Sequence, residues 1–336
     1  MFKHSLRVIA TLAAPLALTT TVSGAEPPPV RIAKYRDNKA AAVCYTFDDG
    51  LRSQYTLAVP ILNRLKVPGT FFIVSGPVAG SAAEAAAKAP GAFGGIAWDQ
   101  LRELAAQGHE IANHTVTHPN LALTYNAAEL ERQVKECSDQ IQREIGARPV
   151  SLAYPGNSRR MYTDRVVLRQ VPVFRAHQYG LGKRDETPAA ANAYLDKLIA
   201  EHRWDAAMIH GLEDGAYDPL RPAVLEAHLQ YAQSRADELW IGTFGEVARY
   251  VQEAEATRAR VLEQSADRVT FVLETALDPE LFNVPLTVII SAPNATAATA
   301  TDTAGNAIPT RLVNGEVLLN AKPGAGPLTM QLTNRP

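Results

Sequence analysis

Thr46-Phe47-Asp48-Asp49-Gly50 follows directly on the apolar run Ala41-Ala-Val-Cys-Tyr45. The run predicts a short buried strand, so two adjacent carboxylates stand at the carboxyl end of that strand. This is the position where α/β folds assemble their functional sites. Adjacent aspartates before a glycine are also common in turns, where their side chains bond the local backbone. The preceding strand favours a functional role for Asp48 and Asp49 over that alternative.

After a proline-rich lead-in of residues 26–40, short apolar runs and amphipathic segments alternate to about residue 256. The expected strands span 41–47, 69–74, 109–113, 150–154, 171–176, 206–209 and 239–242. The expected helices lie near 52–65, 97–107, 126–146, 163–169, 188–203, 220–235 and 243–256. About seven such βα units predict a parallel sheet that closes, or nearly closes, into a barrel over residues 41–256. The Ala- and Gly-rich stretch 76–95 is interpreted as a loop insertion with one helical turn.

The pattern changes after about Arg260, where short β-type runs are separated by Gly, Pro and Asn without a helical period. These runs predict a linker and a small antiparallel, Ig-like β-sandwich in residues 257–336. A sugar-binding module is a tempting interpretation. However, the only aromatic residues of this segment are Phe271 and Phe282, and sugar platforms usually need exposed aromatic faces. We therefore expect a structural or spacer domain.

Residues 1–25 have the pattern of a cleavable secretory signal peptide. Lys3 and Arg7 precede an apolar stretch from Val8 to Leu18, and small residues follow in Val22-Ser-Gly-Ala25. The apolar stretch is shorter than the roughly 20 residues that a bilayer requires, which disfavours a membrane anchor. We expect an exported protein, either secreted or periplasmic.

The net charge bears on the classes of binding partner, and the two cysteines raise the question of a disulfide. A formal net charge of -2 and a pI near 6.5 give no basic footprint, which argues against nucleic acid and anionic membranes as partners. Cys44 and Cys137 could form a disulfide in an exported protein. Cys44 shares the strand parity of Asp48, whereas Cys137 falls in a predicted helix outside the sheet. We therefore expect two buried thiols and no disulfide.

His114 and His118 are four residues apart, a spacing that would bring both rings to one face of a helical turn. Together with Asp49 they would form a three-ligand set that leaves one coordination position open for water, as in catalytic zinc sites. Two histidines and one carboxylate also serve iron oxygenases. The second carboxylate, Asp48, favours hydrolysis because it can take a proton from the attacking water.

Four motifs extend this pattern along the chain: Thr46-Phe-Asp-Asp-Gly50, Gly108-His-Glu-Ile-Ala-Asn-His-Thr-Val-Thr-His118, Ala153-Tyr-Pro-Gly156 and Met208-Ile-His210. Their order resembles that of the polysaccharide deacetylases, carbohydrate esterase family 4, also called the nodulation-factor deacetylase homology domain. The resemblance implies a distorted (β/α)7-type barrel. It also implies a divalent metal, usually Zn²⁺ and sometimes Co²⁺ or another ion, and hydrolysis of acetyl groups from N-acetylated or O-acetylated glycans.

The same resemblance distributes the catalytic roles. It implies that Asp49, His114 and His118 bind the metal and that Asp48 is the general base. The backbone N–H of Tyr154 would stabilise the negative charge that develops on the acetyl carbonyl oxygen. His210 would be the acid that protonates the leaving amine or alcohol.

The third motif departs from the family pattern. An arginine commonly stands just ahead of its Pro-Tyr or Pro-Trp element, but the run Ser151-Leu-Ala-Tyr-Pro-Gly156 contains none. Arg175, in Val173-Phe-Arg-Ala-His177 at the end of the next expected strand, could supply that charge from another direction. The fourth motif of the family is not recognisable in this sequence.

These observations predict a secreted metal-dependent hydrolase that cleaves amide C–N or carboxylic ester bonds. Its substrate would be an acetylated glycan, such as an N-acetylglucosamine polymer, peptidoglycan or acetylated xylan. One alternative is a non-catalytic glycan-binding relative, although base, ligands and acid are all present. The other is an amidohydrolase of the same barrel acting on a small cyclic amide.

Overall fold

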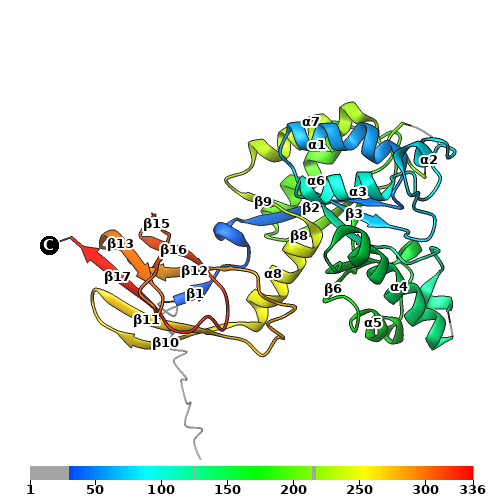
Figure 1. Ribbon diagram of the computed structural model, residues 1–336. Helices are drawn as coiled ribbons and strands as arrows, with labels where there is room; N and C mark the ends of the chain where they lie inside the picture. Colours follow the sequence, from blue (N-terminus) through cyan, green and yellow to red (C-terminus); the bar gives the residue numbers. More distant parts are fainter. Residues whose placement is uncertain (1–29, 125, 214–216, 336) are drawn as a thin grey trace, which may run out of the picture.

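The computed structural model describes residues 30–124, 126–213 and 217–335 and shows two bodies, a barrel and a smaller sandwich (Figure 1). The expected signal peptide, residues 1–25, lies outside the described residues. No helix in the described ranges has the length and apolar character needed to cross a bilayer.

Eight parallel strands build the sheet of the barrel, in the order β6-β5-β4-β3-β2-β8-β7, with β9 beside the first half of β2. Among the described residues no pairing joins β6 to β7, so the curled sheet stays open at that seam. This confirms the predicted distorted α/β barrel. The strands are β2 (Ala41–Asp48), β3 (Gly69–Ile73), β4 (Glu110–Asn113), β5 (Ser151–Ala153), β6 (Val173–Arg175), β7 (Tyr179–Gly180), β8 (Trp204–Ile209) and β9 (Leu239–Ile241).

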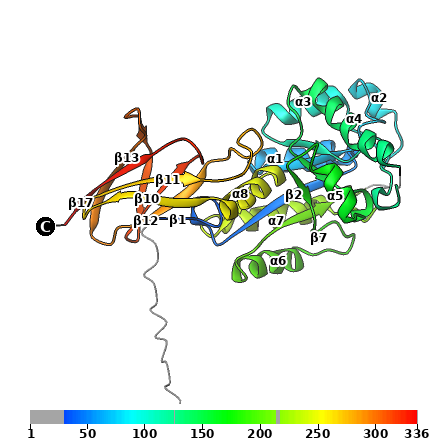
Figure 2. The ribbon, with the colours of Figure 1, turned by 90° about the horizontal axis from the view of Figure 1, so that it is seen from below.

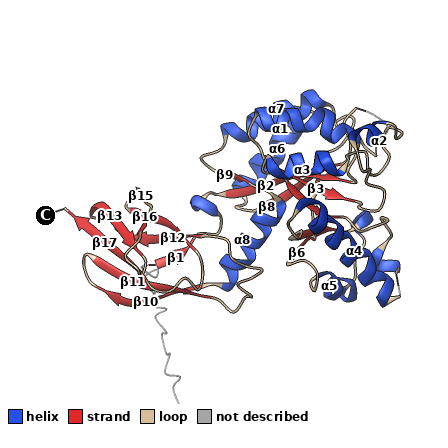
Figure 3. Cartoon of the chain, viewed as in Figure 1, coloured by secondary structure: helices blue, strands red, loops and turns tan. Residues whose placement is uncertain are grey.

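Sequence periodicity located every one of these strands except β7, which is too short to produce an apolar period. The predicted helix over 52–65 is split into a π-helical turn and a short α-helix, and the predicted turn in the 76–95 insertion is α2 (Figure 3). The helices are α1 (Val59–Arg64), α2 (Ala82–Ala86), α3 (Trp98–Ala106), α4 (Ala127–Ile145), α5 (Met161–Val167), α6 (Pro188–Ala200), α7 (Pro222–Ser234) and α8 (Phe244–Ala256), with the tighter or wider turns η1 (Arg36–Asn38), η2 (Gln54–Ala58), η3 (Leu121–Leu123) and η4 (Pro155–Asn157).

The two faces of the sheet have different cores because side chains alternate along each strand. On the outer face, Tyr45, Phe47 and Phe71 pack with apolar residues of α1, α3, α4, α6 and α7. The inner face carries small residues and packs against α8. Its members include Ala42, Cys44, Ala112, Ala153 and Ala206, together with Phe72 and the α8 residues Phe244 and Tyr250.

The predicted absence of a disulfide is confirmed. Cys44 lies in the inner cluster and Cys137 in the outer one, and both are buried free thiols. Burial raises the pKa of both thiols, which keeps them in the neutral form.

The second body is an antiparallel sandwich of two sheets, ordered β1-β12-β16-β15 and β10-β11-β17-β13-β14. Its core contains Phe271, Val288 and Met330. The strands are β1 (Val30–Ile32), β10 (Arg258–Gln264), β11 (Arg268–Glu274), β12 (Leu286–Ser291), β13 (Ala295–Thr301), β14 (Ala307–Ile308), β15 (Thr310–Val313), β16 (Glu316–Ala321) and β17 (Leu328–Asn334).

The lead-in differs from the expectation, whereas the boundary after residue 256 agrees with it. β1 comes from the segment expected as a lead-in and pairs with β12, while β10 begins two residues after α8 ends. Figure 2 shows α8 between the sheet of the barrel and the sandwich. The Tyr250 hydroxyl of α8 donates to the Ala33 carbonyl (3.1 Å) and accepts from the Thr287 N–H (3.2 Å). The two bodies therefore share buried contacts along α8.

His228 of α7 is a fully buried histidine that links the outer helices to the sheet. Its Nδ1 lies 3.0 Å from the Asn192 side-chain oxygen of α6, and its Nε2 lies 3.1 Å from the Tyr45 hydroxyl of β2. A neutral ring satisfies both bonds, with Nδ1–H donating and Nε2 accepting. Burial lowers the pKa of His228 to about 4.

We predict that acidification destabilises the protein partly through His228. Protonation favours the unfolded chain, so the stability associated with this ring is present above pH 6.5 and is lost as pH falls toward 4. The loss is on the order of 2 kcal/mol at pH 4.5. Urea unfolding at pH 7 and pH 4.5 should show a smaller drop for His228→Gln than for the wild type. The exposed-site variant His202→Gln should match the wild type, and equal drops in all three proteins would contradict the prediction.

Candidate active site

The two adjacent aspartates lie at the carboxyl end of β2 but face different partners. Asp48 is the last residue of β2 and pairs in register with Phe72 of β3. Asp49 and Gly50 then adopt positive φ angles of 79° and 66°, a conformation that glycine and, to a lesser degree, aspartate tolerate. This reversal lets the Asp49 carboxylate face the loop that follows β4.

His114 and His118 lie in that loop, and the expectation of a helical turn between them is wrong. The chain leaves β4 at Asn113 and turns irregularly, with positive φ at Thr115 (70°) and His118 (60°). Two local side chains hold the turn. The Asn113 side-chain oxygen accepts from the Thr115 N–H (2.8 Å), and the Thr115 hydroxyl accepts from the His118 N–H (3.0 Å). Short-range capping of the backbone therefore replaces the helix.

Gln133 of α4, which the sequence did not single out, forms hydrogen bonds to the loop between His114 and His118. Its side-chain oxygen accepts from the N–H groups of Val116 (3.1 Å) and Thr117 (3.0 Å), and its amide nitrogen donates to the Thr117 hydroxyl (2.8 Å). Gln133 is 1% exposed. Its position in an amphipathic helix offered no clue to this role.

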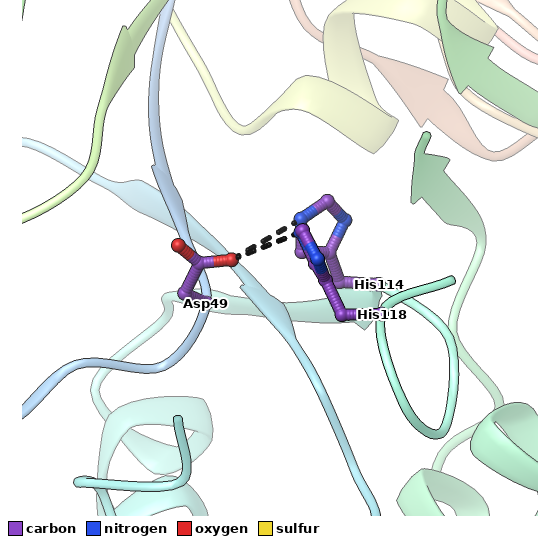
Figure 4. Close-up of side chains that lie close together, drawn as sticks. All are labelled: Asp49, His114 and His118. Carbon is purple, nitrogen blue, oxygen red and sulfur yellow. Dashed lines mark ion pairs between the residues drawn. The ribbon is translucent and has the colours of Figure 1, made fainter. Parts of the chain in front are cut away.

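Asp49, His114 and His118 converge on one point (Figure 4). The Asp49 Oδ1 lies 3.5 Å from His114 Nε2 and 3.4 Å from His118 Nε2, and all candidate ligand atoms lie within 4.8 Å of one another. The Nδ1 of His114 lies 2.8 Å from the Ala153 carbonyl, so it carries the proton and Nε2 presents a lone pair toward Asp49. Burial, assisted by His114, lowers the pKa of His118 and disfavours protonation of that ring.

The Asp49 Oδ1 is buried and has no hydrogen-bond partner among the described residues. An unpaired buried oxygen facing two imidazole nitrogens is costly unless a cation lies between them. Two imidazoles and one carboxylate suit a divalent transition metal and leave coordination positions free. The residues therefore fit the divalent metal that the sequence predicts.

Asp48 pairs with Arg175 at the end of β6. The two guanidinium Nη atoms reach the two carboxylate oxygens at 2.8 and 2.5 Å, and Nη1 also donates to the Thr46 hydroxyl (2.9 Å). Asp48 is 3% exposed and Arg175 is 2% exposed. Burial alone would raise the pKa of Asp48, but the Arg175 guanidinium outweighs it and holds the pKa below its usual value. The charge absent from the third motif thus reaches Asp48 from the next strand.

A cavity of about 500 Å³ contains the acid pair, both histidines, Tyr154 and His210. His210 follows the last residue of β8, and its ring lies 5.3 Å from that of Tyr217. The Tyr154 hydroxyl points away to Asp164 (2.8 Å), which leaves the backbone of Tyr154 at the wall. All the predicted site residues are brought together, with Arg175 behind Asp48. The open barrel and the residues of this cavity define a barrel hydrolase.

Comparison with known proteins shows what this chain is similar to. Residues 35–173 match the family model described as polysaccharide deacetylase. A chitooligosaccharide deacetylase of Sinorhizobium fredii is 29% identical over 181 residues, which cover 52% of this chain and 73% of that protein. A Bacillus protein named gellan lyase is 22% identical over 314 residues, or 83% of this chain, but the chain spans only 12% of its length.

Among solved structures, a family 4 acetyl xylan esterase from Clostridium thermocellum in complex with a cobalt ion aligns with a TM-score of 0.45 at 20% identity. The alignment covers 63% of this chain and 91% of that one. Residues 35–173 are similar to the polysaccharide deacetylases, and the matches support a deacetylase hydrolase. The matched region contains the acid pair, both histidines and Tyr154, and ends before Arg175 and His210.

Removal of the Asp49 carboxylate should abolish tight metal binding. Asp49→Ala leaves two imidazoles without the anionic ligand, so calorimetric titration with Zn²⁺ should show an affinity at least about 100-fold weaker than that of the wild type. Asp185→Ala, which removes an exposed carboxylate elsewhere, should bind like the wild type. Unchanged zinc affinity in Asp49→Ala would contradict this assignment.

Removal of the Arg175 guanidinium should destabilise the fold in a pH-dependent way. Arg175→Met leaves the buried Asp48 carboxylate without a positive partner, which should lower the free energy of unfolding by about 3 to 5 kcal/mol at pH 7. Burial would then raise the Asp48 pKa, so the deficit should shrink as pH falls and the carboxyl becomes neutral. Urea unfolding from pH 7 to pH 4 measures this, with the surface variant Arg143→Met as control. A deficit independent of pH would contradict the ion-pair explanation.

Proposed function

We propose that this protein is an exported, metal-dependent hydrolase that removes acetyl groups from a glycan. The observation that carries the proposal is the pairing of two differently held carboxylates in one cavity. The Asp49 carboxylate faces two imidazoles, while Asp48 forms an ion pair with a buried arginine. One carboxylate is thus available as a ligand and the other as a base.

The residues of the chain support a complete hydrolytic cycle. When bound, a divalent ion would polarise the acetyl carbonyl and acidify water. Asp48, ionised at neutral pH, accepts the proton of the water whose oxygen attacks the acetyl carbon. The Tyr154 N–H stabilises the charge on the carbonyl oxygen, and His210 protonates the leaving nitrogen or oxygen as its bond to carbon breaks. The products are acetate and the free amine or alcohol.

The rim of the cavity supports a sugar polymer as substrate. Phe93, from the 76–95 insertion, is 37% exposed, and Tyr217, from the loop after β8, is 72% exposed. Their rings contact His118 and His210 respectively, so exposed aromatic faces stand beside the ligand and the acid. Sugar rings stack on such faces. Relatives named chitooligosaccharide deacetylase and peptidoglycan-N-acetylglucosamine deacetylase suggest N-acetylated glycans, and the C. thermocellum structure is that of an acetyl xylan esterase.

Export and metal identity complete the proposal. Residues 1–25 have the charge and apolar pattern of a secretory signal. Polymeric glycans of the cell envelope or of plant material lie outside the cytoplasm, where an exported enzyme would meet them. Zn²⁺ suits two imidazoles and one carboxylate, and Co²⁺ accepts the same ligands.

The deciding experiment is acetate release from chitooligosaccharides, peptidoglycan and acetylated xylan by the zinc-reconstituted protein. We expect release from at least one polymer, its loss with a chelator and its recovery on adding Zn²⁺. Asp48→Asn should bind Zn²⁺ normally but release acetate at least about 100-fold more slowly, because the base is gone. Acetate release that does not depend on the metal, or no acetate release from any polymer, would contradict the proposal. Glycan binding without hydrolysis would identify a non-catalytic relative.

A further inference from the structure

Gln54 connects the two strand ends that carry the proposed base and acid. Its side chain is fully buried, and its amide nitrogen lies 2.5 Å from the Asp48 carbonyl oxygen and 2.7 Å from the His210 carbonyl oxygen. Two carbonyl acceptors require the NH₂ end of the amide at this position, which fixes its orientation. The Gln54 Oε1 is buried and has no hydrogen-bond partner in the described part of the chain. Gln54 therefore serves there as a double donor.

The amide lies where the backbone ladder between the two strands has ended. β2 and β8 pair in parallel, and their last matched residues are Phe47 and Ile209. Asp48 and His210 are the next residues on each strand and are not themselves a matched pair. The Gln54 amide ties their two carbonyls together and extends the pairing by one step.

A second bond from the neighbouring residue strengthens this tie. The Ser53 hydroxyl accepts from the Leu212 N–H at 3.0 Å, and both groups are buried. Residues 53 and 54 therefore hold the backbone on both sides of Gly211. Gln54 also begins the π-helical turn η2, a rare wide turn that is frequent at functional sites.

We propose that Gln54 is a positioning residue that sets the distance between Asp48 and His210. This inference rests on the proposed function, because it concerns the residues assigned there as base and acid. Gln54 does not line the cavity and touches no reacting atom, so it acts through the two residues it joins. Loss of the tie displaces the acid and slows the step in which the leaving group is protonated.

The test compares Gln54→Met, which keeps the length but removes both donors, with Gln54→Glu, which also places a carboxylate against two carbonyls. Gln140→Met is the matched control, because Gln140 of α4 likewise has a buried, unpaired side-chain oxygen away from the cavity. On an N-acetylated oligosaccharide we expect Gln54→Met to lower kcat by about 30-fold with KM changed less than about twofold, the size of a partly lost general acid. Gln54→Glu should lose more.

The choice of substrate isolates the acid. With 4-nitrophenyl acetate the leaving group departs without protonation, so Gln54→Met should lower its hydrolysis by less than about threefold. Zinc affinity should stay close to that of the wild type, because Gln54 bonds the Asp48 carbonyl and not the Asp49 side chain, and the two histidine ligands lie in the loop after β4. Equal losses on both substrates, or no loss on either, would overturn the positioning role.

A readout independent of turnover separates this inference from the proposed function. In the zinc-loaded protein with labelled histidine, NMR resonances of the His210 ring, assigned with His210→Ala, should shift in Gln54→Met and stay in place in Gln140→Met. Unchanged His210 resonances would overturn the inference even if the enzyme is active. If the wild type had no deacetylase activity but the His210 resonances still shifted in Gln54→Met, the proposed function would be rejected and the positioning role of Gln54 would stand. Should Gln54→Met fail to fold, Gln54→Asn, which shortens the tie and keeps the amide, carries the same comparison.

Discussion

The buried ion pair between Asp48 and Arg175 is the interaction on which the arrangement of the site depends. Two full charges, each almost completely excluded from water, are tolerable only when both oxygens and the guanidinium are matched in geometry. The pair joins β2 near the middle of the sheet to β6 at its end, so the sheet must curl enough to bring the two strand ends face to face. Small side chains at Ala112 and Ala153 on the intervening strands leave the arginine room to cross. The guanidinium also lies 5.1 Å from the ring centre of Phe72, on the strand beside β2.

Neutral amides hold the rest of the site in place. Asn113 and Gln133 shape the loop of the two histidines, and Gln54 ties the strand ends. Each uses hydrogen bonds to the backbone and adds no charge near the carboxylates. A lysine or glutamate in these positions would alter the ionisation of Asp48 or the basicity of the imidazoles. Support and electrostatics are thus assigned to different residue types.

The sequence predicted the barrel well because its strands and helices have clear periods, and it missed β7, which is too short to show one. The acid pair could be placed at a strand end from its apolar flank, and Arg175 could be nominated from its position at the end of the next strand. The conformation between His114 and His118 could not be predicted, since i,i+4 spacing fits both a helix and the compact turn that Asn113 and Thr115 stabilise. Gln54 and Gln133 escaped notice for another reason. Glutamine is common on exposed helix faces, so burial becomes visible only when the neighbouring strands and loops are in place.

The sandwich takes its strands from both sides of the barrel in the chain: β1 precedes the barrel and β10 follows it. Cutting after α8 would leave β1 without β12, its partner strand, and would uncover Tyr250 and Val251, which pack with Val284 and Leu286. We therefore do not expect the barrel of this protein to keep all of its packing when it is separated from the sandwich. Moving it to another protein with its contacts intact would require both flanking segments, because β1 and β12 lie on opposite sides of the barrel in the chain.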